Sequence, residues 1–300
     1  DNIPGNGDVT RDAVVGTARL SDAELAGWIT ENVAFPNSMV DRITPATGDR
    51  ERALAAEYGL DDPVPVTCEP FRQWVLEDNF PQGRPALEKV GAEFVRDVAP
   101  YELMKLRILN GGHAAIAYPS ALLGHHFVHD AMADPRIRAW LEALETREII
   151  PTLEPIEGVD FEAYRRKVEE RFSNPEIGDT IPRLCFDGTN RQPKFVLPVI
   201  RDALSRGQAI DGLALEVALW CRYCAGTNEA GEKIAPNDDN AEDLERRALA
   251  AKDDPQAFLS NEAVFGDLGA QPVFVAAFSK QLGALWADGV AATLSRYARG

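Results

Sequence analysis

The spacing of apolar residues changes character near residue 77. Before it, short β-branched or aromatic runs alternate with helical ones, whereas from residue 86 on apolar positions recur at intervals of three and four. The pattern predicts a mixed α and β segment followed by a helical layer architecture that continues to the C-terminus. We therefore predict two domains, over 1–76 and 77–300, in a chain that is mainly α.

The first quarter is expected to hold elements of both kinds. Ser21 is the predicted N-cap of its second helix, with Glu24 at the capping-box position. The expected helices are 8–18, 21–32 and 49–58, and the expected extended segments are 33–35, 38–43, 64–68 and 71–76, the last two as a strand pair. The later helices are predicted over 86–97, 100–117, 119–131, 134–149, 160–173, 193–206, 210–225, 239–250, 254–260 and 271–297.

Composition narrows the range of partners. With 300 residues, 45% hydrophobic and 26% charged, the chain can bury a sizeable core, which excludes a disordered protein. Its 31 Lys and Arg against 48 Asp and Glu give a net charge of −17, which repels nucleic acid and anionic membrane surfaces. No apolar run approaches the roughly 20 residues of a membrane span. Four cysteines are too few for a disulfide scaffold, so we expect a cytoplasmic protein.

One predicted helix combines an apolar surface with polar chemistry. The stretch 103–118 is strongly apolar, yet it carries Lys105, Asn110 and His113. At α-helical spacing Asn110 lies about 140° and His113 about 80° from Lys105, so His113 falls between the other two. A buried ammonium group is costly unless it is paired or functional. The stretch is therefore either a site or a polar surface stripe.

The same residues resemble a known family. Lys105 to His113 reads K-x4-N-x2-H, the signature of the polyol-specific long-chain dehydrogenases, and other motifs of that family occur in the same order. The chain looks closest to the mannitol 2-dehydrogenase branch. The matching stretches are Asp1-Asn2-Ile3-Pro4, 35–45, Trp74-Val75-Leu76-Glu77-Asp78, Gly83-Arg84-Pro85 and Ile181-Pro182-Arg183.

The resemblance implies an oxidoreductase that interconverts an open-chain polyol and its ketose, such as D-mannitol and D-fructose, with NAD or NADP and without a metal. In this family the matching lysine, Lys105, is the general base, and Asn2 and Asn110 polarise the reacting oxygen. His113 and Arg183 would bind substrate hydroxyls. A lysine titrates near 10.4, so burial must lower its pKa before it accepts a proton.

The resemblance also implies a fold: a helical substrate-binding domain like the C-terminal domain of 6-phosphogluconate dehydrogenase, preceded by the α/β tail of a Rossmann-type domain. Asp41 is expected beside the cofactor, or else as a helix-capping or ion-paired aspartate.

One departure from the family concerns the cofactor domain. No G-x-G-x-x-G turn lies between a strand and a helix, and Pro4-Gly5-Asn6-Gly7 has no strand before it. We therefore expect 1–76 to be the C-terminal remnant of the dinucleotide-binding domain. The cofactor would then be bound mainly by residues absent from the chain. The missing N-terminal domain would be a partner, and the chain alone would bind NADH weakly and be inactive.

Alternative functions remain open from the sequence. The chain could be a fructuronate or tagaturonate reductase, or a non-catalytic sugar-binding module without a cofactor domain. A helical scaffold without a site requires Lys105 to be exposed. Cys221 and Cys224 form a lone C-x2-C and are predicted to be core or near-surface helix residues. The histidines at 125, 126 and 129 have no adjacent metal-binding motif, so a structural or surface role is predicted for them.

Overall fold

The computed structural model describes residues 2–300 and divides after Lys105 into two compact units, unit 1 to Lys105 and unit 2 from Leu106 to Gly300. This division lies later in the chain than the boundary predicted after residue 76. The reason is the sheet of unit 1, because its third strand is supplied by residues beyond 77. Among the described residues no helix is long and apolar enough to cross a membrane.

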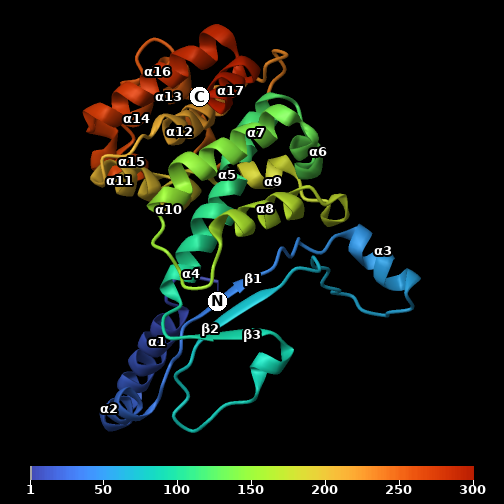
Figure 1. Cartoon of the computed structure of the whole chain (residues 1–300), viewed down its shortest axis with the longest axis vertical. Helices are drawn as coiled ribbons and strands as arrows, with labels where there is room; N and C mark the ends of the chain where they lie inside the picture. Colours follow the sequence, from blue (N-terminus) through green and yellow to red (C-terminus); the bar gives the residue numbers. More distant parts are fainter. Residues whose placement is uncertain (1) are drawn as a thin grey trace. The chain divides into compact units, whose positions relative to one another are not determined.

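Unit 1 contains a three-stranded sheet in the order β1 (Ser38–Asp41), β2 (Gln73–Glu77) and β3 (Ala92–Val95) (Figure 1). β1 runs antiparallel and β3 parallel to the central strand. Met39 lies opposite Val75 in the register, and both pack with Val98 in a buried cluster. The predicted extended segment 38–43 is thus confirmed over four of its residues.

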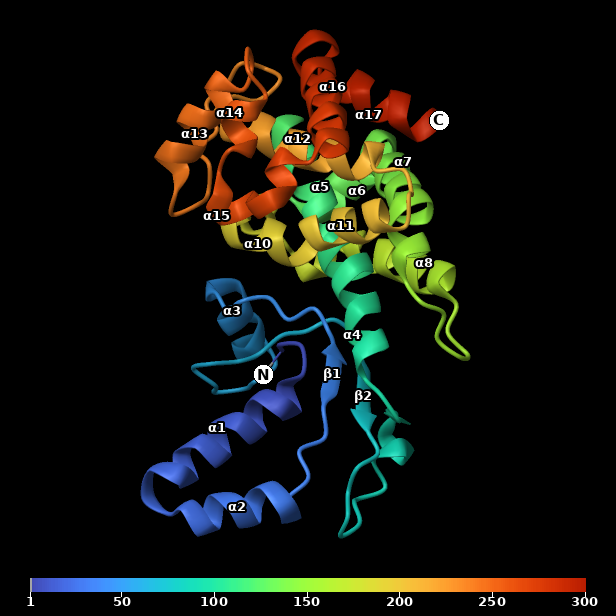
Figure 2. The same ribbon diagram turned by 90° about the vertical axis from the view of Figure 1, so that its left-hand side faces the viewer.

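The helices of unit 1 follow the sequence pattern closely at the start of the chain. α1 (Asn6–Ser21) and α2 (Ala23–Asn32) pack against each other as an antiparallel pair (Figure 2). The N-cap of α2 is Asp22 rather than the predicted Ser21, because the Asp22 carboxylate accepts from two backbone N–H groups of the first turn. α3 (Asp49–Glu57), the 3₁₀-helix η1 (Leu87–Val90) and α4 (Ala99–Met104) complete the unit.

Two predictions in unit 1 are wrong. The segment 64–68 is not a strand: Pro65 lies inside it and lacks the N–H that a ladder needs, Val64 and Val66 are exposed, and β2 pairs with β1 instead. The segment 86–97 is not a helix. Gly91 adopts φ 93°, which ends the 3₁₀ turn, and the next residues join the sheet as β3.

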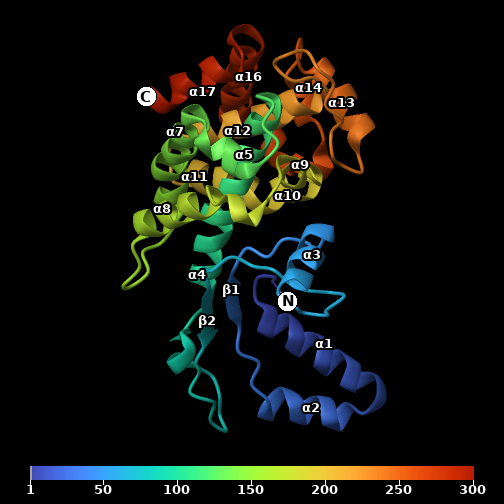
Figure 3. The same cartoon turned by 90° about the vertical axis from the view of Figure 1, so that its right-hand side faces the viewer.

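Unit 2 is helical, as the three-and-four spacing predicted. Its centre is α12 (Asp211–Cys224), which packs against α5 and α16 and is buried over almost its whole length (Figure 3). The other α-helices are α5 (Gly111–Leu122), α6 (Val128–Ala133), α7 (Pro135–Leu144), α8 (Phe161–Phe172), α9 (Ile181–Cys185), α10 (Gly188–Phe195), α11 (Leu197–Ser205), α13 (Ala241–Ala250), α14 (Gln256–Leu259), α15 (Glu262–Phe265), α16 (Pro272–Asp288) and α17 (Val290–Arg299). Two π-helices, η2 (Lys105–Asn110) and η3 (Glu145–Ile149), and three 3₁₀-helices, η4 (Ile150–Thr152), η5 (Pro175–Ile177) and η6 (Gly266–Ala270), join them.

α5 continues through Pro119, where the sequence predicted a break. A proline inside a helix leaves the carbonyl four residues earlier without its amide donor. Here that carbonyl belongs to Ala115, and the indole Nε1–H of Trp140 donates to it at 2.9 Å. A side chain of α7 thus satisfies the oxygen that Pro119 leaves without its donor, so the helix extends to Leu122.

The last predicted helix, 271–297, is two helices. Gly289 adopts φ 81° between them, so the chain turns there and α17 begins at Val290. Phe274, Phe278 and Leu282 on α16 are buried in the core.

Candidate functional site

Lys105 has a buried amine with two oxygen partners in unit 1. Only 8% of the residue is exposed. Its Nζ donates to Asn2 Oδ1 at 2.8 Å and to the Val40 carbonyl at 2.6 Å. The structure thus brings together two of the predicted site residues, Lys105 and Asn2. A helical scaffold without a site required an exposed Lys105, so the burial of this residue argues against that alternative.

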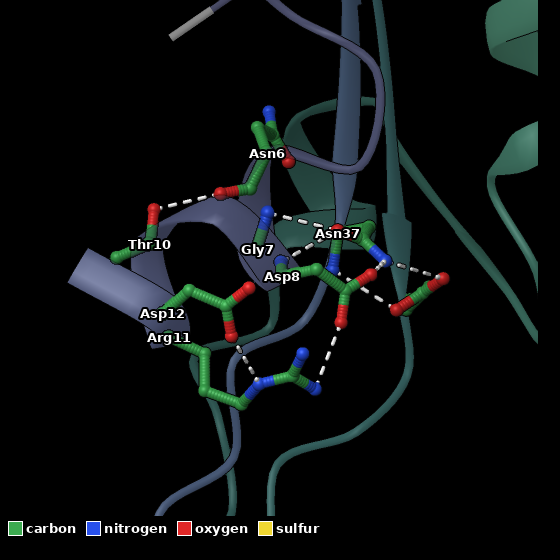
Figure 4. Close-up of polar contacts among 8 residues, drawn as sticks. Asn6, Gly7, Asp8, Thr10, Arg11, Asp12 and Asn37 are labelled. Atoms are coloured by element: carbon green, nitrogen blue, oxygen red, sulfur yellow. Dashed lines mark hydrogen bonds and ion pairs between the residues drawn. The ribbon is translucent and has the colours of Figure 1, made fainter. Parts of the chain in front are cut away.

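The segment that carries Asn2 leads into α1, and the N-terminal end of this helix is fixed to β1 by two asparagines (Figure 4). Asn37 Oδ1 accepts from the backbone N–H groups of Gly7 (2.8 Å) and Asp8 (3.2 Å). Asn6 Oδ1 accepts from the Ser38 N–H, and its Nδ2 donates to the Ser38 carbonyl. Protein groups therefore satisfy the Gly7 and Asp8 N–H groups at the helix start. This agrees with the prediction that Pro4-Gly5-Asn6-Gly7 is not a dinucleotide-binding turn.

Gly7 is required by this close approach. A Cβ at this position would lie 2.4 Å from the Phe35 carbonyl oxygen and 2.7 Å from Pro36 backbone atoms. Only glycine lets the helix start lie directly on the 35–37 segment. The Phe35-Pro36-Asn37 motif therefore forms part of the surface on which the start of α1 packs.

Two carboxylates in unit 1 lie beside these groups in the chain. Asp41 follows Val40 at the end of β1, is 1% exposed and is engaged in polar contacts. Glu102 precedes Lys105 by three residues, and its carboxylate accepts from the Gly5 N–H. Burial raises the pKa of Glu102. Sequence reasoning missed Glu102, although the i,i+3 spacing places it on the Lys105 side of α4.

The first six residues of the K-x4-N-x2-H signature do not form an α-helix. Residues Lys105–Asn110 form the π-helix η2. Because π-helices bond residues five apart, Asn110 comes nearly back to the side of η2 that carries Lys105, and the predicted angle of about 140° does not apply. Asn110 is half-buried.

His113 lies on α5 in unit 2 and is buried. Its ring stacks on Phe172 with centroids 4.1 Å apart and planes at 21°. Its Nε2 has no hydrogen-bond partner among residues 2–300. Burial, with the positive charges of Arg183, Arg191 and Arg171, holds its pKa well below the ordinary value, so the ring is neutral. A neutral imidazole with an unused nitrogen can accept from or donate to a hydroxyl.

Arg183 lies on α9, and Thr180 caps this helix through the Arg183 N–H. Its guanidinium binds both oxygens of the buried Asp179 carboxylate through Nε and Nη2, and the side chain remains half-exposed. The sequence did not single out Arg191, eight positions later, which acts electrostatically on the same histidine. Burial lowers the pKa of Arg191, and its Nη1 donates to the Leu184 carbonyl.

The C-x2-C cysteines lie in the core, as predicted, and the histidines at 125, 126 and 129 are partly or fully exposed. Cys221 and Cys224 are buried in α12, and burial raises the pKa of both thiols. His125 contacts the Asp134 carboxylate at 3.1 Å. Within residues 2–300 no group of three or more potential ligands lies close enough together to hold a metal ion.

Comparison with known proteins extends these observations over the chain. Residues 1–89 match the mannitol dehydrogenase Rossmann domain, and residues 97–286 match the mannitol dehydrogenase C-terminal domain. Mannitol 2-dehydrogenase from Cereibacter sphaeroides is 57% identical over 297 residues, which is 99% of this chain and 62% of that protein.

Several solved structures are similar to this chain. The ternary complex of Pseudomonas fluorescens mannitol 2-dehydrogenase with NAD and D-mannitol has 42% identity and a TM-score of 0.85, covering all of this chain and 61% of that one. A substrate-free D-sorbitol dehydrogenase has 34% identity and a TM-score of 0.87, covering 98% and 61%. The chain thus spans about three fifths of the length of these relatives.

These matches correct part of the sequence interpretation. Because residues 1–89 match the family's Rossmann domain, the domain is present in this chain, and the predictions that it is missing and that cofactor contacts come mainly from outside the chain are wrong. The prediction of an inactive chain has no support either, since it depended on that absence. The resemblance inferred from the signature and its companion motifs is confirmed over both domains. The chain belongs to the mannitol dehydrogenase family.

Proposed function

We propose that this protein oxidises a secondary alcohol of an open-chain polyol to the ketose with NAD, with D-mannitol and D-fructose as the pair. The observation that carries the proposal is the buried amine of Lys105, hydrogen-bonded to Asn2 and to the Val40 carbonyl, within the K-x4-N-x2-H signature. The relatives named mannitol 2-dehydrogenase, and the NAD and D-mannitol held by one of them, support the choice of substrate and cofactor.

Lys105 is the proposed general base. The neutral amine accepts the proton of the substrate hydroxyl as hydride leaves the same carbon, so the C–H electron pair departs and the O–H pair forms the carbonyl. Its low exposure and its hydrogen bonds to Asn2 and Val40 fix the position of the amine for this role. Asn2 and Asn110 carry amide N–H donors, which stabilise the oxygen while it bears negative charge.

His113 and Arg183 are the proposed binding groups for the other hydroxyls. The neutral ring of His113 presents a buried nitrogen without a protein partner among residues 2–300. Arg183 is already neutralised by the bidentate contact with Asp179. This pairing favours a neutral polyol over a uronate, since a substrate carboxylate would compete with Asp179 for the same guanidinium.

NAD supplies the hydride acceptor when it is bound. Asp41 is proposed to lie beside it, because this carboxylate follows Val40, whose carbonyl holds the proposed base. The N-terminal end of α1 does not serve as a pyrophosphate site, since Asn37 already satisfies its Gly7 and Asp8 N–H groups. Independence from metal and a cytoplasmic location remain predictions.

Formation of NADH with D-mannitol tests the function directly. The protein should turn over D-mannitol, and in reverse D-fructose, more efficiently than D-fructuronate. Lys105→Ala should lower kcat strongly with little change in KM, and small primary amines in the buffer should restore part of the rate. Lys89→Ala, an exposed lysine of the same unit, is the matched control and should behave as the unsubstituted protein.

Two results would contradict the proposal. Near-normal kcat in Lys105→Ala would remove the assigned base while leaving the substrate assignment in place. Preference for D-fructuronate would make the protein a uronate reductase, and the argument from Asp179 would be wrong.

A further inference from the structure

Unit 2 contains a cavity for which the proposed reaction has no use. It measures about 420 Å³ and lies among the π-helix η3, the start of α12, and the helices α16 and α17. Small-molecule sites typically enclose roughly 300 to 1,000 Å³, so the cavity is large enough for a ligand of metabolite size. None of the residues proposed for polyol oxidation lines it.

Gln281 is the first sign of a ligand. It lines the cavity from α16 and only 8% of the residue is exposed. Its side-chain amide makes no hydrogen bond with any of residues 2–300. The amide atoms are open to the cavity, and they offer both donors and an acceptor to a molecule bound there. A ligand hydroxyl or carboxylate would satisfy it.

Charge at the cavity is the second sign. Arg147 lines it and donates to the carbonyl oxygens of Tyr297 and Ala298, so its positive charge has no carboxylate partner within the described chain. The carboxylate of Glu148, on the same π-helix, is engaged elsewhere. It accepts from the Gly212 N–H at 2.7 Å and from two further protein donors.

Two more cations, Lys280 and Arg296, line the cavity and are partly exposed. Lys280 contacts Asp211 at 2.9 Å, and Arg296 contacts Asp288. The lining thus holds three cationic side chains and the carboxylates of Glu148 and Asp211. Lys280 and Arg296 are neutralised by their ion pairs, so among the described lining residues Arg147 is the cation that remains to bind a small anion.

We propose that this cavity binds a small organic anion that also carries hydroxyl groups, such as a hydroxycarboxylate or a sugar phosphate. The anionic group meets the Arg147 guanidinium, and a hydroxyl meets the Gln281 amide. The site is separate from the proposed polyol site and stands whether or not that proposal holds.

Isothermal titration calorimetry of the whole protein tests the site, with citrate and glucose 6-phosphate as probes and glucose as the neutral control. At least one anion should bind saturably at one site per chain, and glucose should not. Binding should persist when D-mannitol is saturating. Preference between the two probes decides whether the anionic group is carboxylate or phosphate.

Gln281→Leu and Arg147→Gln should each weaken binding about tenfold or more, the scale of one lost hydrogen bond to a charged group. Arg166→Gln, an exposed arginine on α8, is the matched control and should leave Kd unchanged. Arg147 also donates to two carbonyls of α17, so Arg147→Gln could loosen that helix. Gln281→Leu breaks no hydrogen bond among residues 2–300, so weaker binding in this variant reports a lost ligand contact.

The proposal is overturned if neither anion binds saturably, if glucose binds as well, or if D-mannitol abolishes binding. It is also overturned if Gln281→Leu binds as tightly as the unsubstituted protein, or if Arg166→Gln weakens binding to the same extent.

Discussion

Glu216→Gln should remove most of a pH dependence of stability that the buried carboxyl of Glu216 imposes. Glu216 lies on α12, is 1% exposed, and accepts from Gln192 Nε2 at 2.8 Å. Its second oxygen has no hydrogen-bond partner among residues 2–300. Burial raises the pKa of Glu216 from 4.5 to about 8, against the smaller opposing effects of Gln192 and Arg191.

The sign and size follow from proton linkage. The folded protein holds this proton more tightly than the unfolded chain, so the contribution to stability is complete below the unfolded pKa and is lost as pH rises through about 8. Between pH 6 and pH 9 the loss amounts to about 3 kcal/mol, an order-of-magnitude figure for a fully buried group. The amide side chain of the Glu216→Gln variant cannot titrate, so this part of the decline should disappear.

Urea unfolding followed by circular dichroism at pH 6 and pH 9 measures the difference. The unsubstituted protein should lose about 3 kcal/mol more between the two conditions than Glu216→Gln does. Glu242→Gln, an exposed glutamate at the start of α13, is the matched control and should keep the full decline. Equal pH dependence in the unsubstituted protein and in Glu216→Gln would refute the reasoning.

Four further substitutions test the site and the fold. Asn110→Ala should lower kcat for D-mannitol about 100-fold, the scale of one lost oxyanion donor, and an unchanged kcat would exclude that role. Arg183→Ala should mainly raise KM, by about tenfold, in steady-state kinetics, whereas a fall in kcat alone would contradict a binding role. Trp140→Phe leaves a buried helix carbonyl without its donor and should cost about 1–3 kcal/mol in urea unfolding. Gly7→Ala should cost about 1–3 kcal/mol through its clash with backbone, while Gly16→Ala, which has open space, should not destabilise.

The sequence by itself determined the helical character of unit 2 and the family signature on which the proposed site residues depend. Apolar spacing of three and four depends on residues a few positions apart, so it predicted α8, α12 and α13 nearly to their ends. The signature around Lys105 is also local, and with the Asn2 motif it indicated the proposed base and its companion asparagine before any contact was known. For Asn110, His113 and Arg183 the structure supplies burial and neighbours, and their roles remain proposals.

Tertiary structure decided what depends on partners distant in the chain. Lys105 reaches Asn2 and Val40 across 103 and 65 positions, and no local pattern encodes which carbonyl a buried amine will meet. The helix predicted over 86–97 gave way to a strand because Val75 and its neighbours in β2 offered a parallel edge. α5 passes through Pro119 because the Trp140 indole satisfies the carbonyl that the proline leaves without a donor. In β3 and α5 the local preference was overridden because folding must satisfy strand edges and buried polar groups. Their partners, like those of Lys105, are known only once the chain is folded.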